Sequence, residues 1–313
     1  MALEDKIKDA EVTLKLAAEM SAYYYNKPLI VCYSGGKDSD VLLDIAKNCL
    51  KPADFEVLNS HTTVDAPETV YHIRDVFKEC EAQGIKTEIR LPRDKDGKLI
   101  SMWSLVEKKK MPPTRIVRYC CQYLKETSTP NRMIALGVRE DESAGRAGRE
   151  AFGVRPTRKT DNEYRTTSHT FAMFRIDQTG KEGAYECEMI KACKKNKDTI
   201  CNPIYRFTES DIWQYIHAQN LTINPLYSRG YKRVGCVGCP LGGANNMRRE
   251  FADYPKYKLN YIRAFDRMLK ARIANGLPSG EWRNGEDVFK WWLGENPKQV
   301  TFDDILNEEA IND

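Results

Sequence analysis

Short apolar runs alternate with longer amphipathic stretches over the first part of the chain. The runs at 29–33, 55–60 and 86–91 have the length and apolar content of buried strands in a parallel sheet. Apolar residues have helical spacing from residue 40 onward, and again in a second stretch that ends at residue 80. The same spacing predicts a first helix over 4–25. Strands that alternate with helices predict an α/β fold. We expect a doubly wound, mostly parallel sheet that binds ligands at the carboxyl ends of its strands.

The turn between the first strand and the next helix has the composition of a phosphate site. Its sequence is Ser34-Gly-Gly-Lys-Asp-Ser39. Gly35 and Gly36 allow a close backbone approach, and the helix that follows points its unpaired N–H groups and positive dipole end at the same place. Ser34, Lys37 and Ser39 add two hydroxyl groups and one cation. The alternative is an ordinary strand-to-helix turn that binds nothing. The order differs from a Walker A loop, in which four residues separate the glycines.

A second candidate lies after the second strand, at Asp65-Ala-Pro-Glu-Thr69. Pro67 and Glu68 are typical of the first turn of a helix, where the dipole favours a carboxylate. A ligand role for Asp65 and Glu68 is equally compatible with this position, and both interpretations can hold.

Composition restricts the class of protein. The chain has 313 residues and 41% hydrophobic content, enough to bury a core. We find neither an apolar run of membrane-spanning length nor a cationic leader, and so expect a cytoplasmic protein with no membrane partner. The net charge of +4 does not by itself imply a nucleic-acid partner. Ten cysteines without an export signal favour metal or redox chemistry over disulfides.

Four of these cysteines form two pairs, Cys120-Cys121 and Cys236-x-x-Cys239. Four thiolates suit zinc or an iron–sulfur cluster, and adjacent cysteines are unusual in a zinc knuckle. The alternative is that Cys120 is buried, Cys121 is free and only the later pair has a function. Three further cysteines could form a second metal site with His169, although their spacing fixes no geometry: Cys187, Cys193 and Cys201.

Together these motifs resemble one family. Ser34-Gly-Gly-Lys-Asp-Ser39 resembles the pyrophosphate loop of the N-type ATP pyrophosphatases, in the Rossmann-like superfamily of adenine-nucleotide α-hydrolase-like enzymes. The cysteine pairs are similar to those that hold a [4Fe–4S] cluster in the phosphoadenosine/adenosine phosphosulfate reductase family. The resemblance implies four ligands, Cys120, Cys121, Cys236 and Cys239. It also implies that Lys125 lies beside the cluster, although Leu124 stands where those reductases tend to have Arg.

Two further segments extend this resemblance. Leu136-Gly-Val-Arg-Glu-Asp-Glu-Ser-Ala-Gly-Arg146 looks like the family's Gly-x-Arg-x-x-x-Ser-x-x-Arg segment. It implies a place near the nucleotide, or near an anionic substrate, for four residues: Gly137, Arg139, Ser143 and Arg146. Without the resemblance, the two arginines read equally well as solvated loop charges. The segment from Asn202 to Ile216 also matches the family, but Thr208 and Asp211 have a structural explanation there, as a helix cap.

These features predict three parts: an N-terminal helix over 1–26, a family domain over 27–240 with a polar insertion at about 150–200, and a helical module over 241–313. Tyr254, Tyr257, Tyr261, Phe265 and Met268 have helical spacing in the last part. We interpret this stripe as core in preference to a base-stacking surface.

Two departures from the reductases decide the predicted function. No cysteine follows Cys239, so the tail nucleophile of the reductases is missing, and the loop at 34–39 is intact, which favours ATP. The chain in this respect resembles the ATP pyrophosphatase of DNA phosphorothioation systems and the cluster-bearing tRNA thiolases. The resemblance implies that Lys37, Asp38 and Arg139 act on ATP and Mg²⁺ to adenylylate a nucleic acid or a small anionic acceptor. Sulfur would then come from a partner such as a cysteine desulfurase.

Two alternatives stay open. One is a reductase in which Cys187 or Cys201 replaces the missing nucleophile, and the other is a nucleotide and redox sensor without catalysis. The sequence also leaves the oligomeric state open, with a homodimer among the arrangements it allows.

Overall fold

A computed structural model describes residues 1–126, 129, 132–142, 151–154, 199–280 and 282–295. The chain forms two compact units. We call the first the sheet unit: Met1–Ser60, Pro67–Arg90 and Ser128–Val234. The second is the helical unit: His61–Ala66, Leu91–Thr127 and Gly235–Asp313. The domain boundaries at residues 26 and 240 remain a prediction from the sequence.

Within the described part of the chain, the sheet unit has six strands in the order β3-β2-β1-β4-β6-β5. Their bounds are β1 Leu29–Cys32, β2 Phe55–Ser60, β3 Lys86–Arg90, β4 Met133–Ala135, β5 Phe152–Val154 and β6 Thr199–Cys201. All neighbouring pairs are parallel except β5 with β6. From β1 the order runs outward through β2 and β3 on one side, and through β4 and β6 on the other. The predicted α/β class with a mostly parallel, doubly wound sheet is confirmed, and its switch point lies between β1 and β4.

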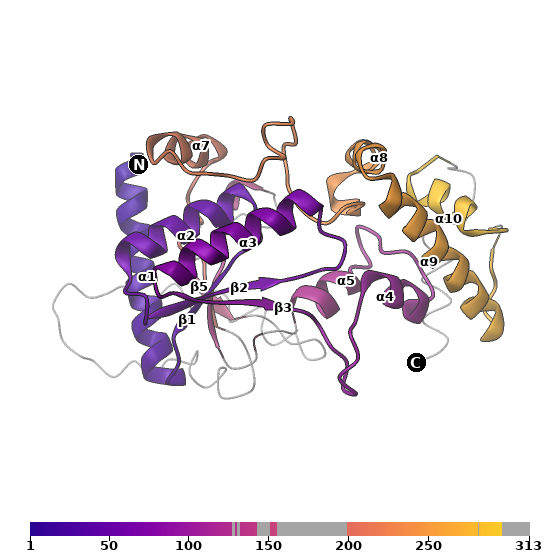
Figure 1. The fold of residues 1–313 in the computed structure, drawn as a ribbon, viewed down its shortest axis with the longest axis horizontal. Helices are drawn as coiled ribbons and strands as arrows, with labels where there is room; N and C mark the ends of the chain where they lie inside the picture. The colour runs from indigo at the N-terminus through magenta and orange to yellow at the C-terminus, as the bar shows by residue number, and fades with distance from the viewer. Residues whose placement is uncertain (127–128, 130–131, 143–150, 155–198, 281, 296–313) are drawn as a thin grey trace. The chain divides into compact units, whose positions relative to one another are not determined.

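Alternate residues of the strands enter two different apolar clusters, as the period of a strand requires. Leu29, Val31 and Val57 belong to the large core that also contains Leu14 and Leu42 from the helices. Ile30, Leu58 and Ile134 form a small cluster of their own. The described helices of this unit are α1 Leu3–Tyr25, α2 Lys37–Cys49, α3 Pro67–Ala82 and α7 Glu209–Ala218 (Figure 1). The expected first helix, the helix after the loop and the helix through Cys80 are therefore all present.

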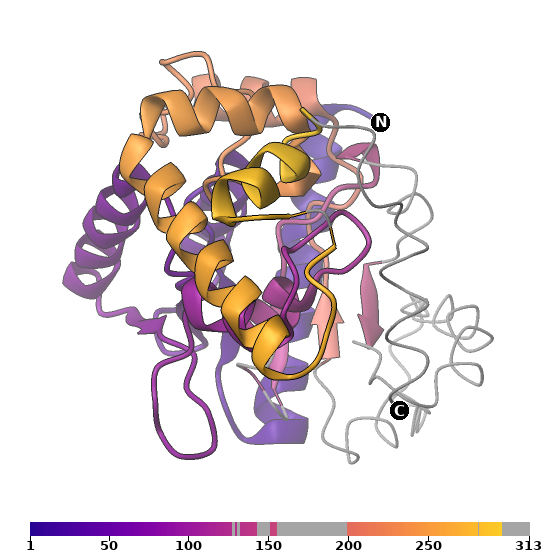
Figure 2. The same ribbon diagram turned by 90° about the vertical axis from the view of Figure 1, so that its right-hand side faces the viewer.

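The helical unit contains α4 Met102–Lys109, α5 Tyr119–Cys121, α8 Ala244–Asp253, α9 Pro255–Ala274 and α10 Gly285–Trp292. Helices α9 and α10 lie side by side (Figures 1 and 2). Gly285 allows this approach, because a Cβ there would lie 2.2 Å from the carbonyl oxygen of Ile262.

An aromatic core fills the helical unit. The ring centroids of Tyr261 and Trp292 lie 4.8 Å apart, and those of Phe251 and Phe289 lie 4.9 Å apart. Tyr261, Phe265 and Met268 are buried, which confirms the interpretation of this part of the stripe as core. Among the described helices of the chain, none combines the length and the apolar character that crossing a membrane requires.

Candidate nucleotide site and cysteine cluster

The loop from Ser34 to Ser39 follows β1 at the switch point of the sheet. Gly35 has a φ of +72°, and a Cβ there would lie 2.9 Å from Cγ1 of Ile73 on α3. Both observations require glycine at this position. Helix α2 begins at Lys37, so that the N-terminal end of a helix follows the glycine pair, as the sequence predicts. The loop is thus placed where doubly wound proteins bind phosphates.

The segment after β4 packs closely against this loop. Gly137 comes soon after β4, and a Cβ there would lie 3.1 Å from the carbonyl oxygen of Asp38 and 3.3 Å from the backbone nitrogen of Ser39. These neighbours are backbone atoms, which cannot turn aside as a flexible side chain can. The glycine therefore lets Arg139 approach the loop, two residues further along the chain.

Four charged side chains converge at the start of α2. Arg139 Nε lies 2.6 Å from Asp38 Oδ1, and Lys37 Nζ lies 3.2 Å from Asp38 Oδ2. Glu209 Oε2 lies 2.7 Å from Arg139 Nη2 and 3.2 Å from Lys37 Nζ. The Lys37 and Arg139 side chains are almost fully buried. Two buried cations beside a glycine loop offer several charge-assisted hydrogen-bond donors to an anion that displaces a carboxylate from them.

Two residues that the sequence did not single out for the site also hold the loop. The side-chain nitrogen of Asn224 donates to the carbonyl oxygen of Gly35 and to Oγ1 of Thr69, at 3.0 Å each. The hydroxyl oxygen of Tyr227 accepts a 3.0 Å hydrogen bond from the backbone N–H of Lys37. The spacing of the segment Asn224-Pro-Leu-Tyr227 gives no indication of a contact with residues 35–37.

Glu68, the other acidic candidate of this unit, pairs with Arg229. Glu68 lies in the first turn of α3, as the helix-start interpretation expects. Ser143 and Arg146 lie outside the described residues.

The two cysteine pairs belong to the helical unit. Cys120 and Cys121 lie on α5, and Cys236 and Cys239 flank a turn whose Gly238 has a φ of +76°. Glu250 of α8 fixes this turn, because its Oε2 accepts a 2.6 Å hydrogen bond from the backbone N–H of Gly238.

Asp65, predicted as a ligand of the nucleotide, lies in the helical unit beside Cys236, with which it forms an isolated β-bridge. Its carboxylate accepts hydrogen bonds of 2.8 Å from the backbone N–H and the hydroxyl group of Thr62. The thiol of Cys236 lies 3.3 Å from the same hydroxyl oxygen. The segment at 61–66 thus supports the second cysteine pair.

The four thiols interact electrostatically. A hydrogen bond with Cys120 lowers the pKa of Cys121, helped by the nearby Arg118 and Lys125, and the same pairing with Cys121 raises the pKa of Cys120. Burial raises the pKa of Cys236 to about 11, against the opposing charge of Lys125. The pKa of Lys125 is raised mainly by Cys236, with contributions from Asp65, Cys121 and Cys239. The structure therefore brings Lys125 and all four cysteines into one neighbourhood.

The donor set fits a thiolate-bound cluster in its chemistry. Four thiols with a cation beside them match the soft ligands and the charge balance that an iron–sulfur cluster requires. Within the described ranges, no three His, Cys, Asp or Glu side chains are grouped as ligands of one metal ion. The [4Fe–4S] cluster stays a prediction.

Of the residues of the possible second metal site, the structure describes Cys201. Cys201 ends β6 and is fully buried, and burial raises the pKa of its thiol. Cys187, Cys193 and His169 lie outside the described residues, so the second metal site is untested.

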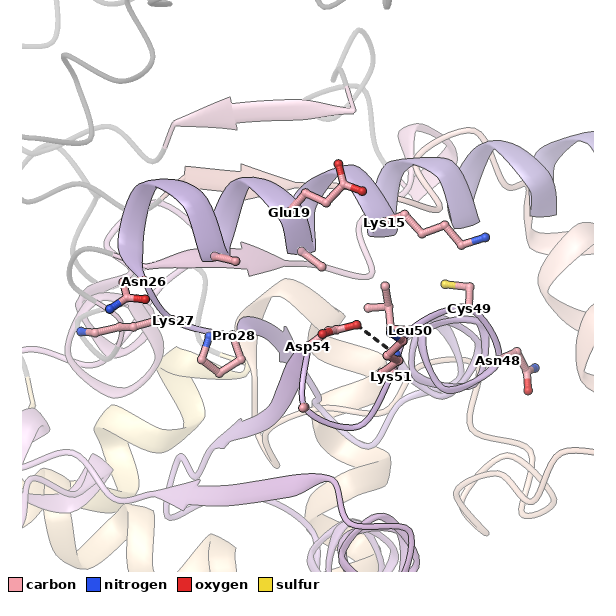
Figure 3. A pocket seen from close by; sticks show the side chains of 13 residues that line it. Lys15, Glu19, Asn26, Lys27, Pro28, Asn48, Cys49, Leu50, Lys51 and Asp54 are labelled. Carbon is pink, nitrogen blue, oxygen red and sulfur yellow. Dashed lines mark hydrogen bonds between the residues drawn. The ribbon is translucent and has the colours of Figure 1, made fainter.

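A cavity of about 660 Å³ lies elsewhere in the sheet unit (Figure 3). It is placed where α1 and α2 end, with Lys15 on α1 opposite Cys49 on α2. Lys27, Lys51 and Asp54 also line it. The predicted site residues do not line this cavity, which borders the amino ends of β1 and β2.

Comparison with known proteins gives a match to a family model. The model of the phosphoadenosine phosphosulfate reductase domain matches residues 28–241. An uncharacterised protein of Methanocaldococcus jannaschii is 25% identical over 270 residues, which are 82% of this chain but only 46% of that protein. The chain thus spans less than half the length of this relative.

Two further relatives carry named activities. The adenosine 5'-phosphosulfate reductase of Anoxybacillus flavithermus is 21% identical over 69% of this chain and 74% of its own length. Sulfate adenylyltransferase subunit 2 of Maricaulis maris is 24% identical over 73% of this chain and 68% of its own length. Among solved structures, the U34-tRNA thiolase NcsA of Methanococcus maripaludis, with its [4Fe-4S] cluster, has a TM-score of 0.42 and 14% identity. That match covers 92% of this chain and 80% of the thiolase.

Proposed function

The chain belongs to the phosphoadenosine phosphosulfate reductase domain family, whose members are enzymes that act on nucleotides, and on this premise we propose that it is an ATP pyrophosphatase. The proposed reaction adenylylates an acceptor and so prepares it for sulfur transfer. The acceptor is a nucleic acid or a small anion, and the sulfur comes from a partner such as a cysteine desulfurase.

The observation that carries this proposal is the pair of buried cations beside the intact loop. Lys37 and Arg139 meet at the N-terminal end of α2, next to Gly35 and Gly36. Backbone N–H groups, the helix dipole and two cations together suit several negative charges at once. Of the nucleotides considered, only ATP brings a β,γ-pyrophosphate to such a site.

The residues have separable roles in the proposed reaction. Lys37 and the loop N–H groups bind the β- and γ-phosphates, and Arg139 stabilises charge on the α-phosphate. Asp38 orients Arg139 through the 2.6 Å contact between its Oδ1 and the arginine Nε. An acceptor oxygen attacks the α-phosphorus, the bond to the bridging oxygen breaks, and pyrophosphate leaves with the bonding electron pair. Mg²⁺, when bound, neutralises part of the charge on that leaving group.

Sulfur transfer completes the proposed sequence. A sulfur nucleophile bonds to the acceptor atom that carries the adenylylated oxygen, and AMP leaves. Cys120, Cys121, Cys236 and Cys239 would hold a [4Fe–4S] cluster, and Lys125 would balance its charge. Such a cluster can supply electrons, a binding site for sulfur or structural support.

A sulfonucleotide reductase is the second candidate, and the likeness to an adenosine 5'-phosphosulfate reductase favours it. That reaction needs a thiol that reaches the substrate sulfur. Cys201 is fully buried, which does not favour this role for it, while Cys187 lies outside the described residues.

One experiment separates these candidates. Anaerobically purified protein is incubated with ATP, sulfide and candidate nucleic acids and, separately, with adenosine phosphosulfate and a thiol reductant. We expect AMP and pyrophosphate from ATP, and their loss in a Lys37→Ala variant. Release of sulfite from adenosine phosphosulfate would support the reductase instead. Nucleotide binding without any turnover would contradict both and support a sensor.

A further inference from the structure

Glu209 occupies the place where a phosphate is expected. It is the first residue of α7, and its Oε2 contacts both cations of the site, Arg139 Nη2 at 2.7 Å and Lys37 Nζ at 3.2 Å. Its other oxygen, Oε1, accepts a 3.1 Å hydrogen bond from the indole nitrogen of Trp213, one turn along the same helix. The carboxylate thus mimics an anion that bridges the two phosphate-binding side chains.

The carboxylates of the site cancel its positive charge. Lys37 and Arg139 bring two positive charges, and Asp38 and Glu209 bring two negative charges within 3.2 Å of them. Asp141 adds a third carboxylate, 3.3 Å from Arg139 Nη1. A polyphosphate that entered this arrangement would meet no net attraction from these charged groups. One carboxylate has to leave before the cations can bind phosphate oxygens at full strength.

Glu209 is better placed to leave than Asp38. The side chain of Glu209 is 50% exposed, whereas that of Asp38 is 19% exposed. Asp38 also belongs to the loop and follows Lys37 directly, so it moves with the site. Glu209 comes from a separate helix and can rotate into solvent, while Lys37 and Arg139 are held at 6% and 3% exposure.

We propose that Glu209 is a specificity-determining residue that holds the position of a nucleotide phosphate until a polyphosphate displaces it. This inference rests on the proposed function, because it takes the loop at 34–39 as a pyrophosphate site. A polyphosphate brings more negative charge and more acceptor oxygens than a single phosphate, so it competes better with the carboxylate for Lys37 and Arg139. Return of Glu209 to Lys37 and Arg139 would also assist the release of pyrophosphate.

The contacts of Trp213 provide a direct signal of this displacement. The indole N–H of Trp213 is hydrogen-bonded to Glu209, and its ring lies edge-on to Tyr227 with centroids 5.6 Å apart. Tyr227 in turn accepts a hydrogen bond from the backbone N–H of Lys37. When Glu209 leaves, the indole N–H loses its acceptor, and its NMR resonance should move.

The first test is calorimetric titration of the full chain with inorganic pyrophosphate in the presence of Mg²⁺. We expect Glu209→Gln to bind pyrophosphate about tenfold more tightly than the wild type, as expected when a competing charge-assisted contact is removed. Glu19→Gln is the matched control, because Glu19 lies in the same unit at the cavity of Figure 3 and its removal changes the net charge equally. Equal or weaker binding by Glu209→Gln would overturn the proposal.

The second test needs no altered Glu209 and so does not depend on how that variant folds. The indole resonance of Trp213 is assigned from its absence in Trp213→Phe and followed while the wild type is titrated with pyrophosphate. We expect the resonance to shift as the indole N–H loses its carboxylate acceptor. An unshifted resonance at saturation would overturn the proposal. Neither of these two tests measures turnover. The proposed function is tested separately, and it fails if ATP yields no AMP and pyrophosphate.

Discussion

The hydroxyl group of Tyr33 donates a 2.5 Å hydrogen bond to Oδ1 of Asp40, which ties the residue before the phosphate loop to the residue after it. His72 of α3 joins this pair, with its Nε2 2.9 Å from the Tyr33 oxygen and 3.0 Å from Asp40 Oδ1. All three side chains are buried. Burial, followed by the charge of Asp40, raises the pKa of Tyr33 well above its ordinary value, so that its hydroxyl remains a donor. Both ends of the loop are therefore fixed to α3.

This arrangement predicts a loss of stability in Tyr33→Phe. The change removes a donor from a buried carboxylate, whose other oxygen, Asp40 Oδ2, has no hydrogen-bond partner among the described residues. We expect the free energy of unfolding in urea to fall by about 1–3 kcal/mol. Tyr71→Phe, at an exposed position of the same helix as His72, is the control and should change little. Equal effects of the two substitutions would contradict this role of Tyr33.

The contact between β4 and the loop predicts a selective defect in Gly137→Ala. The added Cβ would lie 3.1 Å from the carbonyl oxygen of Asp38, so the loop backbone or the end of β4 must shift. We expect weaker ATP binding by about tenfold, measured by calorimetry, because the shift separates Arg139 from the loop. Gly153→Ala on β5 is the control, since an added Cβ there meets no atom within 4 Å. Unchanged ATP affinity in Gly137→Ala would show that the contact does not position the site.

The cysteine pairs predict a brown protein. After purification without oxygen, we expect the broad visible absorbance of thiolate-bound iron, together with iron and acid-labile sulfide. Cys121→Ser and Cys239→Ser should bleach it. Cys49→Ser should not, because Cys49 lies at the end of α2 in the sheet unit. Stoichiometric zinc without iron or sulfide would disprove the cluster.

Lys125 is expected to tune the cluster by its charge. Its ammonium group interacts with the charges of Cys236, Cys121 and Cys239. We expect Lys125→Ala to alter the visible spectrum or the reduction potential of the cluster and to lower activity. Lys108→Ala, on α4 of the same unit, serves as the control for loss of one positive charge. A Lys125→Ala variant with unchanged spectrum, potential and activity would rule out this role.

Local sequence features predicted much of this structure. The glycine pair, the apolar run before it and the helical spacing after it act within a few residues, and they led directly to β1, the loop and α2. The cap of α7 is also local: the side chain of Thr208 accepts a hydrogen bond from the backbone N–H of Asp211, as the sequence predicts.

Long-range contacts were not predictable in the same way. The three strands β4, β5 and β6 have three residues each, which is too short for a clear period. The sequence gives Glu209 no role, because nothing in its spacing reveals that Lys37 lies against it. The position of Asp65 after a strand suggests a ligand role, and its bridge to Cys236 is a long-range contact that the sequence does not reveal. Such contacts depend on the folded topology and not on neighbouring residues.

The most direct measurement of the central claim is calorimetric titration of the anaerobic protein with ATP, adenosine phosphosulfate and AMP in the presence of Mg²⁺. Each charge-assisted hydrogen bond contributes about 1.5–3 kcal/mol, so two or three bonds made only to the β,γ-pyrophosphate should make ATP bind about a hundredfold more tightly than AMP. Lys37→Ala should remove most of this preference and leave AMP affinity unchanged, while Lys47→Ala on the same helix should retain it. Equal affinities for ATP and AMP, or equal losses of both in Lys37→Ala, would contradict the assignment of this chain as an ATP pyrophosphatase.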